Sequence, residues 1–487
     1  MKRLLPILLV LLMFLGCSNN DKTINEAEYT DLQDNLDIHC YNSATLNPIF
    51  AENNANMQLS WICFEPLLKT TNDGSITTAL ARGYFISENG LEWTVPLQND
   101  VRWHDGTLFT AKDVVATCNE ILNNENSIYY YNLSNVKKVV AVDDTTVRFV
   151  LNNPQSGFAN LLEFPIVKQE YVKKTNDFLM IGTGPFKYDK TENKNIIFKV
   201  NNEWWGNQKP YIKTITAKIL PDKDTAVYSF NAKVIDVISS SIKDWNKYPS
   251  EAKNVAEYST GDFFYLKLNL NTPVFSNFYI RCAVAQAIDK SAVKDMAMLS
   301  YGVVTDTVIN PLWKFYNKDS YKLSFNPSQA KQMVSANAGD GVNLRIIVNE
   351  ESEIKLKTAT QVKSNLISVG FNAEVSVLNW NDYKDAYYNG DYDLAVCEIN
   401  YSPEMISKAV IGNSEEANDL FNQLQNCSID EDKKEIFIKI QDLTCGNLEI
   451  VPLFFDTGML LFNDNVLSGL SPTRNNIYND IHLWKLK

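Results

Sequence analysis

The stretch "RWHDGTLFTAKDVV", residues 102–115, holds the most informative set of local folding signals in the chain. Asp105-Gly106 is typical of a tight turn, because glycine adopts a positive φ at no steric cost. "TAKD" then resembles a capping box, with Thr110 as the N-cap and Asp113 in the N3 position, which predicts that a helix begins here. Apolar residues at positions 114, 115, 118, 121 and 122 lie on one face of that helix.

Two strands are predicted before the turn. "LEWTVPLQ", residues 91–98, alternates apolar and polar side chains, and "VRW", residues 101–103, predicts a second short strand. His104 beside Asp105 is also a candidate catalytic or metal-binding pair. The other two histidines, His39 and His482, are far away in sequence, and neither an HExxH nor a GxSxG motif occurs. We therefore predict a scaffold turn here, with no catalytic residue and no metal.

Beyond this stretch, helices and strands alternate, which predicts an α/β fold class. Helices are predicted at 278–298, at 326–339 with Asn326 as N-cap and Gly339 after the last turn, and at 353–370. Strand patterns at 371–380 and 392–399 follow the last helix. This order has the βαβ character of an α/β domain.

Length, charge and cysteines exclude several classes of protein. A chain of 487 residues predicts two or three domains, because one hydrophobic core stops growing near roughly 250–300 residues. The net charge of −13 argues against a nucleic-acid partner, which would need a basic face. Seven cysteines follow Cys17 at irregular spacings without a CxxC pair, so neither a disulfide nor a zinc site is predicted. No cofactor is expected.

The N-terminus, "MKRLLPILLVLLMFLGCSNN", predicts export. Lys2 and Arg3 precede a short apolar run, as in a secretory signal, and Gly16-Cys17 resembles a bacterial lipoprotein cleavage site. That resemblance implies a signal peptide at 1–17 and a lipidated Cys17. Residues 18–36 are polar and acidic, which predicts a disordered tether. The alternatives are an uncleaved anchor or a plain secretion signal.

Several landmarks, taken in order, resemble family 5 of the bacterial extracellular solute-binding proteins, the oligopeptide, dipeptide and nickel receptors of ABC importers. The longest matching block runs from Cys63 to Val115 and contains the opening stretch. "TLNPIF" precedes this block, with Asn47 where the family has Asp, and "GTGPFKY", "NNEWWGNQKPYIKTITAKILPD" and "VPLFF" follow it. The resemblance spans about Leu46 to Gly469.

The resemblance implies a two-lobed periplasmic-binding-protein fold of the large, three-subdomain type. The first lobe is expected to comprise residues 37–68, 181–262 and 463–487, with an inserted domain at 69–180. Residues 263–462 are expected to form the second lobe. Ligands of the family bind between lobes that close by a hinge motion. The inserted domain is expected to lie largely away from this cleft.

Ligand-facing positions also follow from the resemblance. It places Glu52, Asn53 and Asn54 on a cleft loop, Ser240 and Ser241 at a strand end, and Trp380 in the cleft. Peptide receptors of the family carry an acidic residue after the strand that is "YDLAV" here, and it pairs with the peptide ammonium. "CEINYSPEM", residues 397–405, offers Asn400 and Ser402 but no Asp, with Glu398 or Glu404 as the substitutes. This departure puts free-amine peptides in doubt and admits modified peptides or sugars.

The resulting expectation is a solute-binding lipoprotein that acts as a monomer and is not an enzyme. It captures a peptide-like solute and delivers it to ABC permease subunits. It is held by its lipid on the outer face of the cytoplasmic membrane, or faces the periplasm if there is an outer membrane. The alternatives are a receptor for a sugar or metal chelate, and a sensor or adhesion lipoprotein. A secreted enzyme is disfavoured because none of the searched motifs supplies an acid, base or nucleophile.

Overall fold

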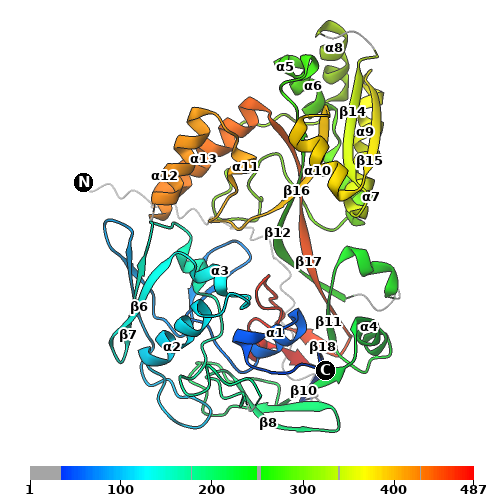
Figure 1. Cartoon of the computed structure of the whole chain (residues 1–487). Coiled ribbons are helices and arrows are strands. Elements are labelled where there is room, and N and C mark those ends of the chain that lie inside the picture. Colours follow the sequence, from blue (N-terminus) through cyan, green and yellow to red (C-terminus); the bar gives the residue numbers. More distant parts are fainter. Residues whose placement is uncertain (1–33, 177, 249–253, 338–340, 428) are drawn as a thin grey trace, which may run out of the picture.

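The computed structural model describes residues 34–176, 178–248, 254–337, 341–427 and 429–487. Two lobes are joined by a pair of long strands (Figure 1). We call residues 34–248 and 463–487 the lower lobe and residues 263–455 the upper lobe. The predicted signal peptide with Cys17, most of the tether and Gly339 lie outside the described residues.

The lower lobe contains a four-stranded sheet in the order β1-β10-β9-β8. Its first two strands are parallel, and the others are antiparallel. Helix α1 (Asn54–Ser60) begins after Asn53, whose side chain accepts a hydrogen bond from the Asn56 amide at 2.9 Å. The strands are β1 (Asn35–Tyr41), β10 (Thr214–Leu220), β9 (Asn195–Val200) and β8 (Phe186–Glu192), and helix α4 (Lys223–Asn231) follows β10.

A second four-stranded sheet, in the order β4-β5-β7-β6, forms what we call the inserted part of the lower lobe, residues 69–180. Trp93, Val95 and Phe149 are buried in a hydrophobic cluster that also includes residues of β1, β10 and the C-terminal segment. The inserted part therefore shares one core with the rest of the lobe. Its elements, with the strand pair that leads into it, are β2 (Leu68–Thr70), β3 (Ile76–Thr78), β4 (Phe85–Ile86), β5 (Glu92–Pro96), α2 (Ala111–Leu122), α3 (Tyr130–Leu133), β6 (Val136–Asp143) and β7 (Thr146–Leu151).

The two connecting strands are β12 (Asn254–Leu268) and β17 (Ile450–Phe462), which pair antiparallel over most of their length. The lower end of β17 pairs with β11 (Val237–Ser240), and the upper end of β12 pairs with β16 (Leu394–Asn400). The register of β12 shifts between Ser259 and Phe263. The other strands of this sheet are β14 (Asn343–Asn349), β15 (Asn372–Leu378) and β13 (Val303–Val304), and a small separate pair is β18 (Val466–Ser468) with β19 (Lys485–Leu486).

Helices cover the sheet in the upper lobe (Figure 1). One buried cluster packs α6, α7 and α9 against the strands, and another packs α10 to α13. The helices are α5 (Pro273–Ser276), α6 (Phe278–Ala287), α7 (Lys290–Met298), α8 (Pro327–Asn337), α9 (Glu353–Ser368), α10 (Trp380–Asn389), α11 (Lys408–Ile411), α12 (Glu415–Asn426) and α13 (Asp430–Asn447).

Most of the predicted elements are confirmed. Helix α2 begins after Thr110, whose backbone N–H donates to Asp113 Oδ2 at 2.9 Å, which completes the capping box. The Asn326 side chain caps α8, and β14, α9 and β15 form the βαβ unit with parallel strands.

Two local predictions are wrong. The segment 278–298 is two helices, because Ile288 leaves the helical region with ψ at 112° and Asp289 caps the second helix. The predicted strand "VRW" is only an isolated bridge between Arg102 and Leu108.

The His-Asp turn is confirmed as a scaffold. Gly106 has a φ of +86°. The His104 ring lies against "GTG", residues 182–184, with Nε2 at 3.1 Å from the Gly184 carbonyl oxygen. The Gly182 amide donates to Nδ1 at 3.2 Å, so the neutral Nε2–H tautomer satisfies both contacts. Burial lowers the pKa of His104 to about 4.

We expect His104→Ala to lower the free energy of unfolding by about 1–3 kcal/mol, because it leaves the Gly182 amide without its partner and leaves the Gly184 carbonyl oxygen only its hydrogen bond from Asn201. The folded chain keeps this ring neutral, whereas an unfolded histidine takes up a proton near pH 6.5. The wild type therefore loses stability as the pH falls from about 6.5 to about 4, and the variant loses less over that window. Urea denaturation across this pH range measures both effects, and an unchanged pH profile would contradict the assignment.

Candidate functional site

A cavity of about 370 Å³ lies between the two lobes, and we call it the interlobe cavity. Both lobes, the β12 bulge and the C-terminal segment contribute to it. The expectation that the inserted part lies largely away from the cleft is wrong, because this part supplies one wall. The lining residues are Thr70, Thr71, Asn72, Asn132, Asn160 and Leu161 from the inserted part, Ser259, Thr260 and Gly261 from β12, Trp313, Asn400, Tyr401, Ser402, Pro403 and Met405 from the upper lobe, and Thr473, Arg474 and Asn475.

The β12 bulge shapes the back of the interlobe cavity. Gly261 has a φ of +83°, and a Cβ atom there would lie 2.2 Å from the Tyr401 carbonyl oxygen. Only glycine fits this close approach of two backbones. The bulge therefore fixes where β16 ends and where Asn400 and Ser402 enter the cavity.

Asn400 links the bulge to the only charged residue in the cavity lining, Arg474. Its Oδ1 accepts a hydrogen bond from Arg474 Nη2 at 2.8 Å. Its Nδ2 donates to the Thr260 carbonyl oxygen at 3.3 Å and to Asp262 Oδ1. Asn400 thus uses both ends of its amide to hold this wall of the cavity.

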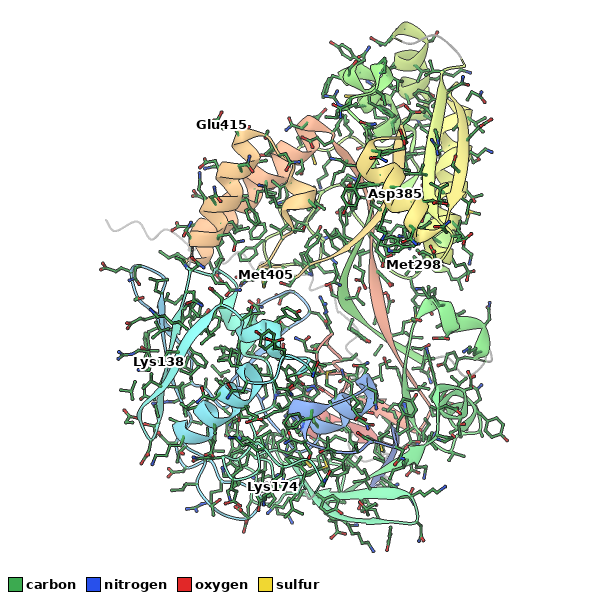
Figure 2. All side chains as sticks on the ribbon, in the orientation of Figure 1. Lys138, Lys174, Met298, Asp385, Met405 and Glu415 are labelled. Carbon is green, nitrogen blue, oxygen red and sulfur yellow. The ribbon has the colours of Figure 1, made fainter. Side chains whose placement is uncertain are left out.

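A close contact between the inserted part and the loop of residues 401–405 covers the cavity, and we call it the roof contact. Met405 lies at the boundary between the lobes (Figure 2). An added Cβ at Gly157 would lie 3.0 Å from Met405 Cγ and 3.1 Å from Glu404 Cβ, and one at Gly74 would lie 2.5 Å from Pro403. The two lobes are therefore in direct contact here, with no space for larger side chains.

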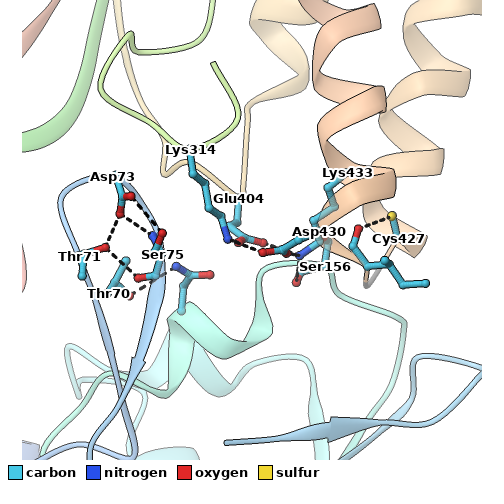
Figure 3. Close-up of polar contacts among 12 residues, drawn as sticks. Thr70, Thr71, Asp73, Ser75, Ser156, Lys314, Glu404, Cys427, Asp430 and Lys433 are labelled. Atoms are coloured by element: carbon cyan, nitrogen blue, oxygen red, sulfur yellow. Dashed lines mark hydrogen bonds and ion pairs between the residues drawn. The ribbon is translucent and has the colours of Figure 1, made fainter. Parts of the chain in front are cut away.

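Glu404 is part of the roof contact and is not a free carboxylate. It is buried and pairs with Lys314 at 2.7 Å and with Lys433 at 2.6 Å (Figure 3). Lys433 also donates to the Ser156 carbonyl oxygen of the inserted part at 3.3 Å. Two lysines satisfy this carboxylate, so the idea that Glu404 substitutes for an amine-binding acid does not fit the geometry.

Three other carboxylates, Asp262, Glu398 and Asp456, gather on the strands next to the cavity. Burial raises the pKa of Asp456 to about 7, and the charges of Asp262 and Glu398 add to this shift. Burial also raises the pKa of Glu398, opposed by the charge of Lys355. Glu398 is exposed but lies outside the lining of the interlobe cavity.

A further buried acid supports the cavity from behind. Glu163 accepts a hydrogen bond from Asn475 Nδ2 at 2.7 Å, and burial raises its pKa to about 7. Trp61 Nε1 donates to the Asn475 carbonyl oxygen at 2.8 Å. These contacts fix the C-terminal segment that lines the cavity.

A second cavity of about 320 Å³ lies in the lower lobe, on the other side of the segment 473–478. Asn54, Ser240 and Ser241 line this cavity, together with His39 and Tyr478. Asn53 is engaged as the cap of α1, and Glu52 Oε2 accepts a hydrogen bond from Ser43 Oγ at 3.3 Å. The structure thus separates these predicted positions from Asn400 and Ser402.

Trp380 lies outside both cavities. It is the first residue of α10, half-exposed, and its ring stacks on Tyr383 with centroids 5.8 Å apart. Its backbone N–H donates to Glu351 Oε1 at 2.7 Å.

Several residues of the interlobe cavity were not predicted from the sequence. Asn72, Asn132, Asn160, Trp313 and Arg474 come from five separate segments. No spacing pattern joins them, since only the fold brings them together. Gly261 between Thr260 and Asp262 was the one usable local signal, because an isolated glycine in a strand pattern indicates a bulge or a close backbone approach.

Within the described part of the chain, no group of three or more His, Cys, Asp or Glu residues could hold a metal ion. In the same residues, no helix is long and apolar enough to span a bilayer. All seven cysteines from Cys40 to Cys445 are free thiols, and only Cys427 is not buried.

Comparison with known proteins gives the same fold. The family model described as "Bacterial extracellular solute-binding proteins, family 5 Middle" matches residues 75–408. The glutathione-binding protein GsiB of Salmonella choleraesuis is 24% identical over 350 residues, which cover 69% of this chain and 68% of GsiB.

Two solved structures illustrate the likeness of fold. The ABC transporter substrate binding protein CtaP of Listeria monocytogenes has a TM-score of 0.69 and 23% identity, with 94% of this chain and 100% of CtaP covered. HbpA2 of Haemophilus parasuis has a TM-score of 0.76 and 21% identity, with 93% and 100% covered.

We expect Gly157→Leu to hinder the roof contact, because the new side chain meets Met405 and Glu404. Overpacking of about 1–3 kcal/mol shifts the lobes roughly 5- to 100-fold toward an open arrangement. Small-angle scattering in the presence of a casein digest measures this as a larger radius of gyration. Gly446→Leu is the matched control, since a Cβ there meets nothing within 4 Å. Equal compaction of both variants would contradict the role of the roof contact.

Proposed function

The chain belongs to family 5 of the bacterial extracellular solute-binding proteins, and we propose that it captures a peptide-like solute in its interlobe cavity. Members of this family are substrate-binding receptors of ABC transporters and not enzymes. We infer further that this chain acts as a monomer that delivers its solute to permease subunits.

The observation that most favours a peptide-like ligand is the lining of the interlobe cavity. Five asparagine side chains face it, at positions 72, 132, 160, 400 and 475, with hydroxyl groups of Thr and Ser and the indole of Trp313 between them. Asparagine offers both donors and acceptors, as a peptide group does. Asn400 and Asn72 already use both ends of their amides within the protein, whereas the Oδ1 atom of Asn160 is buried without a hydrogen-bond partner among the described residues and can accept from a ligand N–H. The volume of about 370 Å³ also falls in the usual range of small-molecule sites, about 300–1,000 Å³.

Capture follows from the position of the cavity between two bodies that share β12 and β17. A solute that contacts the inserted part, the bulge and the 401–405 loop at once gains all these contacts only when the lobes are closed. Such a ligand binds the closed state more tightly and shifts the population toward it. The roof contact then keeps water and solute from exchanging, and the closed form is the one presented to the permease.

We keep the division into lobes predicted from the sequence, with 69–180 inserted in the first lobe and 263–462 as the second. The hydrophobic clusters support it. One cluster joins buried residues between 36 and 237 with buried residues between 460 and 486. The buried residues of two others lie within 263–455, with the partly buried Ile242 packed against one of them. The hinge is expected within residues 256–263 of β12 and the facing part of β17.

We expect the purified protein to retain short peptides from a casein digest when complexes are measured by native mass spectrometry. The bound masses identify the ligand class directly. Gly446→Leu provides a control for a folded protein with an unchanged cavity. Retention of only sugars or metal chelates, offered in the same experiment, would contradict the peptide assignment and favour the other receptor functions.

We also propose that the protein is a lipoprotein, supported by the Gly16-Cys17 site after a signal-like apolar run. A single lipid with the polar tether would hold the lobes at the outer face of the cytoplasmic membrane, or facing the periplasm where an outer membrane exists.

We expect Cys17→Ser to release the protein from the membrane fraction, because the serine hydroxyl cannot accept the thioether-linked lipid. Fractionation of cells followed by immunoblotting measures this, with Cys427→Ser as a control for loss of an unrelated thiol. Retention of the Cys17→Ser protein in membranes would refute lipid anchoring and favour an uncleaved anchor.

A further inference from the structure

Among the residues that the structure describes, Arg474 is the only charged side chain that lines the interlobe cavity. It lies between Thr473 and Asn475, in the segment that Trp61 and Glu163 fix from behind. Its Nη1 lies 3.1 Å from the place where a Cβ of residue 261 would be, so the glycine leaves room for the guanidinium beside the bulge. Arg474 therefore has a fixed place at the wall of the cavity.

The positive charge of Arg474 is not matched by a carboxylate in contact with it. Among the residues that the structure describes, its one hydrogen bond is from Nη2 to Asn400 Oδ1, a neutral acceptor, and it forms no ion pair. Asp262 acts on it only through space, since the Asp262 carboxylate accepts from the other end of Asn400. Arg474 is exposed, so its remaining N–H groups are open to the cavity, and partial desolvation lowers its pKa.

A guanidinium at a cavity wall with no carboxylate against it is open to a ligand oxyanion, which it binds through charge-assisted hydrogen bonds. The guanidinium has five N–H groups in a planar fork, which matches the two oxygens of a carboxylate. A phosphate dianion fits less well, because no second cation lines the cavity and Asp262 lies nearby. We propose that Arg474 binds a carboxylate of the ligand in the interlobe cavity, which makes this protein a receptor for peptide-like acids.

This assignment rests on the proposed function for the site but names one residue and one ligand group. It also indicates where in the cavity the rest of the ligand lies. With the carboxylate at Arg474, next to Asn400 and Gly261, the amide part of the ligand lies toward the other lining residues, which include Asn132 and Asn160 of the inserted part.

The test uses the purified full chain and two matched mixtures. One is a casein digest with free carboxyl groups, and the other is the same digest after methyl esterification, which removes the negative charges. Native mass spectrometry of the wild type is expected to show retention of free acids and at least 10-fold less of their esters. Equal retention of acids and esters would overturn the proposal.

Variants then locate the effect. Arg474→Gln is expected to weaken retention of the acids roughly 10- to 100-fold and to bring acids and esters to the same level, as for the loss of a charge-assisted hydrogen-bond pair. Arg474→Lys keeps the charge and should retain part of the preference. Arg345→Gln, at an exposed position of β14 in the upper lobe, is the matched control and should behave as the wild type. An Arg474→Gln protein that still prefers the acids would overturn the proposal.

A third panel separates this proposal from the peptide assignment. It contains non-peptide mono-, di- and tricarboxylic acids, their amides, and phosphorylated compounds of similar size. If no peptide binds but carboxylic acids bind in an Arg474-dependent way, the peptide assignment fails and the Arg474 site stands. Preference for phosphorylated compounds, or the absence of any carboxylate ligand in all three mixtures, would overturn the Arg474 site.

Discussion

The fold depends on one constraint, the pairing of β12 with β17 across both lobes. These strands are long enough to take part in the lower lobe, where β11 joins them, and in the upper lobe, where β16 and β14 extend the sheet. Continuous pairing would make a stiff connection, but the register shift between Ser259 and Phe263 interrupts it. Bulges bend and twist a strand locally. The larger of the two register shifts in this pairing thus lies at the junction of the lobes, and the interlobe cavity opens beside it.

Closure and binding are consequences of the same arrangement. The bulge places Gly261 against Tyr401, which sets the course of the loop 401–405 as it leaves β16. That loop reaches the inserted part and forms the roof contact through Pro403, Glu404 and Met405. A buried carboxylate at this point would be unfavourable alone, but Lys314 and Lys433 compensate it within the upper lobe. The roof contact can therefore form and separate without leaving Glu404 unpaired.

The sequence predicted elements well wherever the signals were local. Thr110 and Asp113, three residues apart, define the start of a helix through the capping box. Asp105-Gly106 defines a turn through the positive φ of its glycine. The prediction of one helix at 278–298 was wrong because an apolar helical pattern continues through Ile288. The break depends on Asp289, which caps a new helix, and the continuous apolar pattern concealed that signal. The site was predicted least well. Asn400 and Ser402 were predicted because they follow one recognisable strand. The lining residues at 72, 160, 313 and 474 are far apart in sequence, and only the tertiary structure brings them to the same cavity.

Membership of the family does not by itself determine the identity of the ligand. The matched family model ends at residue 408, so it includes the bulge, β16 and the roof loop, which determine that a cavity exists between the lobes. Thr473, Arg474 and Asn475 lie beyond this point and contribute the only charge to the lining. The Asn475 carbonyl oxygen is tied to Trp61 and its side chain to Glu163, both in the lower lobe. The proposed carboxylate site at Arg474 therefore lies outside the matched segment, on a part of the chain that the lower lobe holds in place.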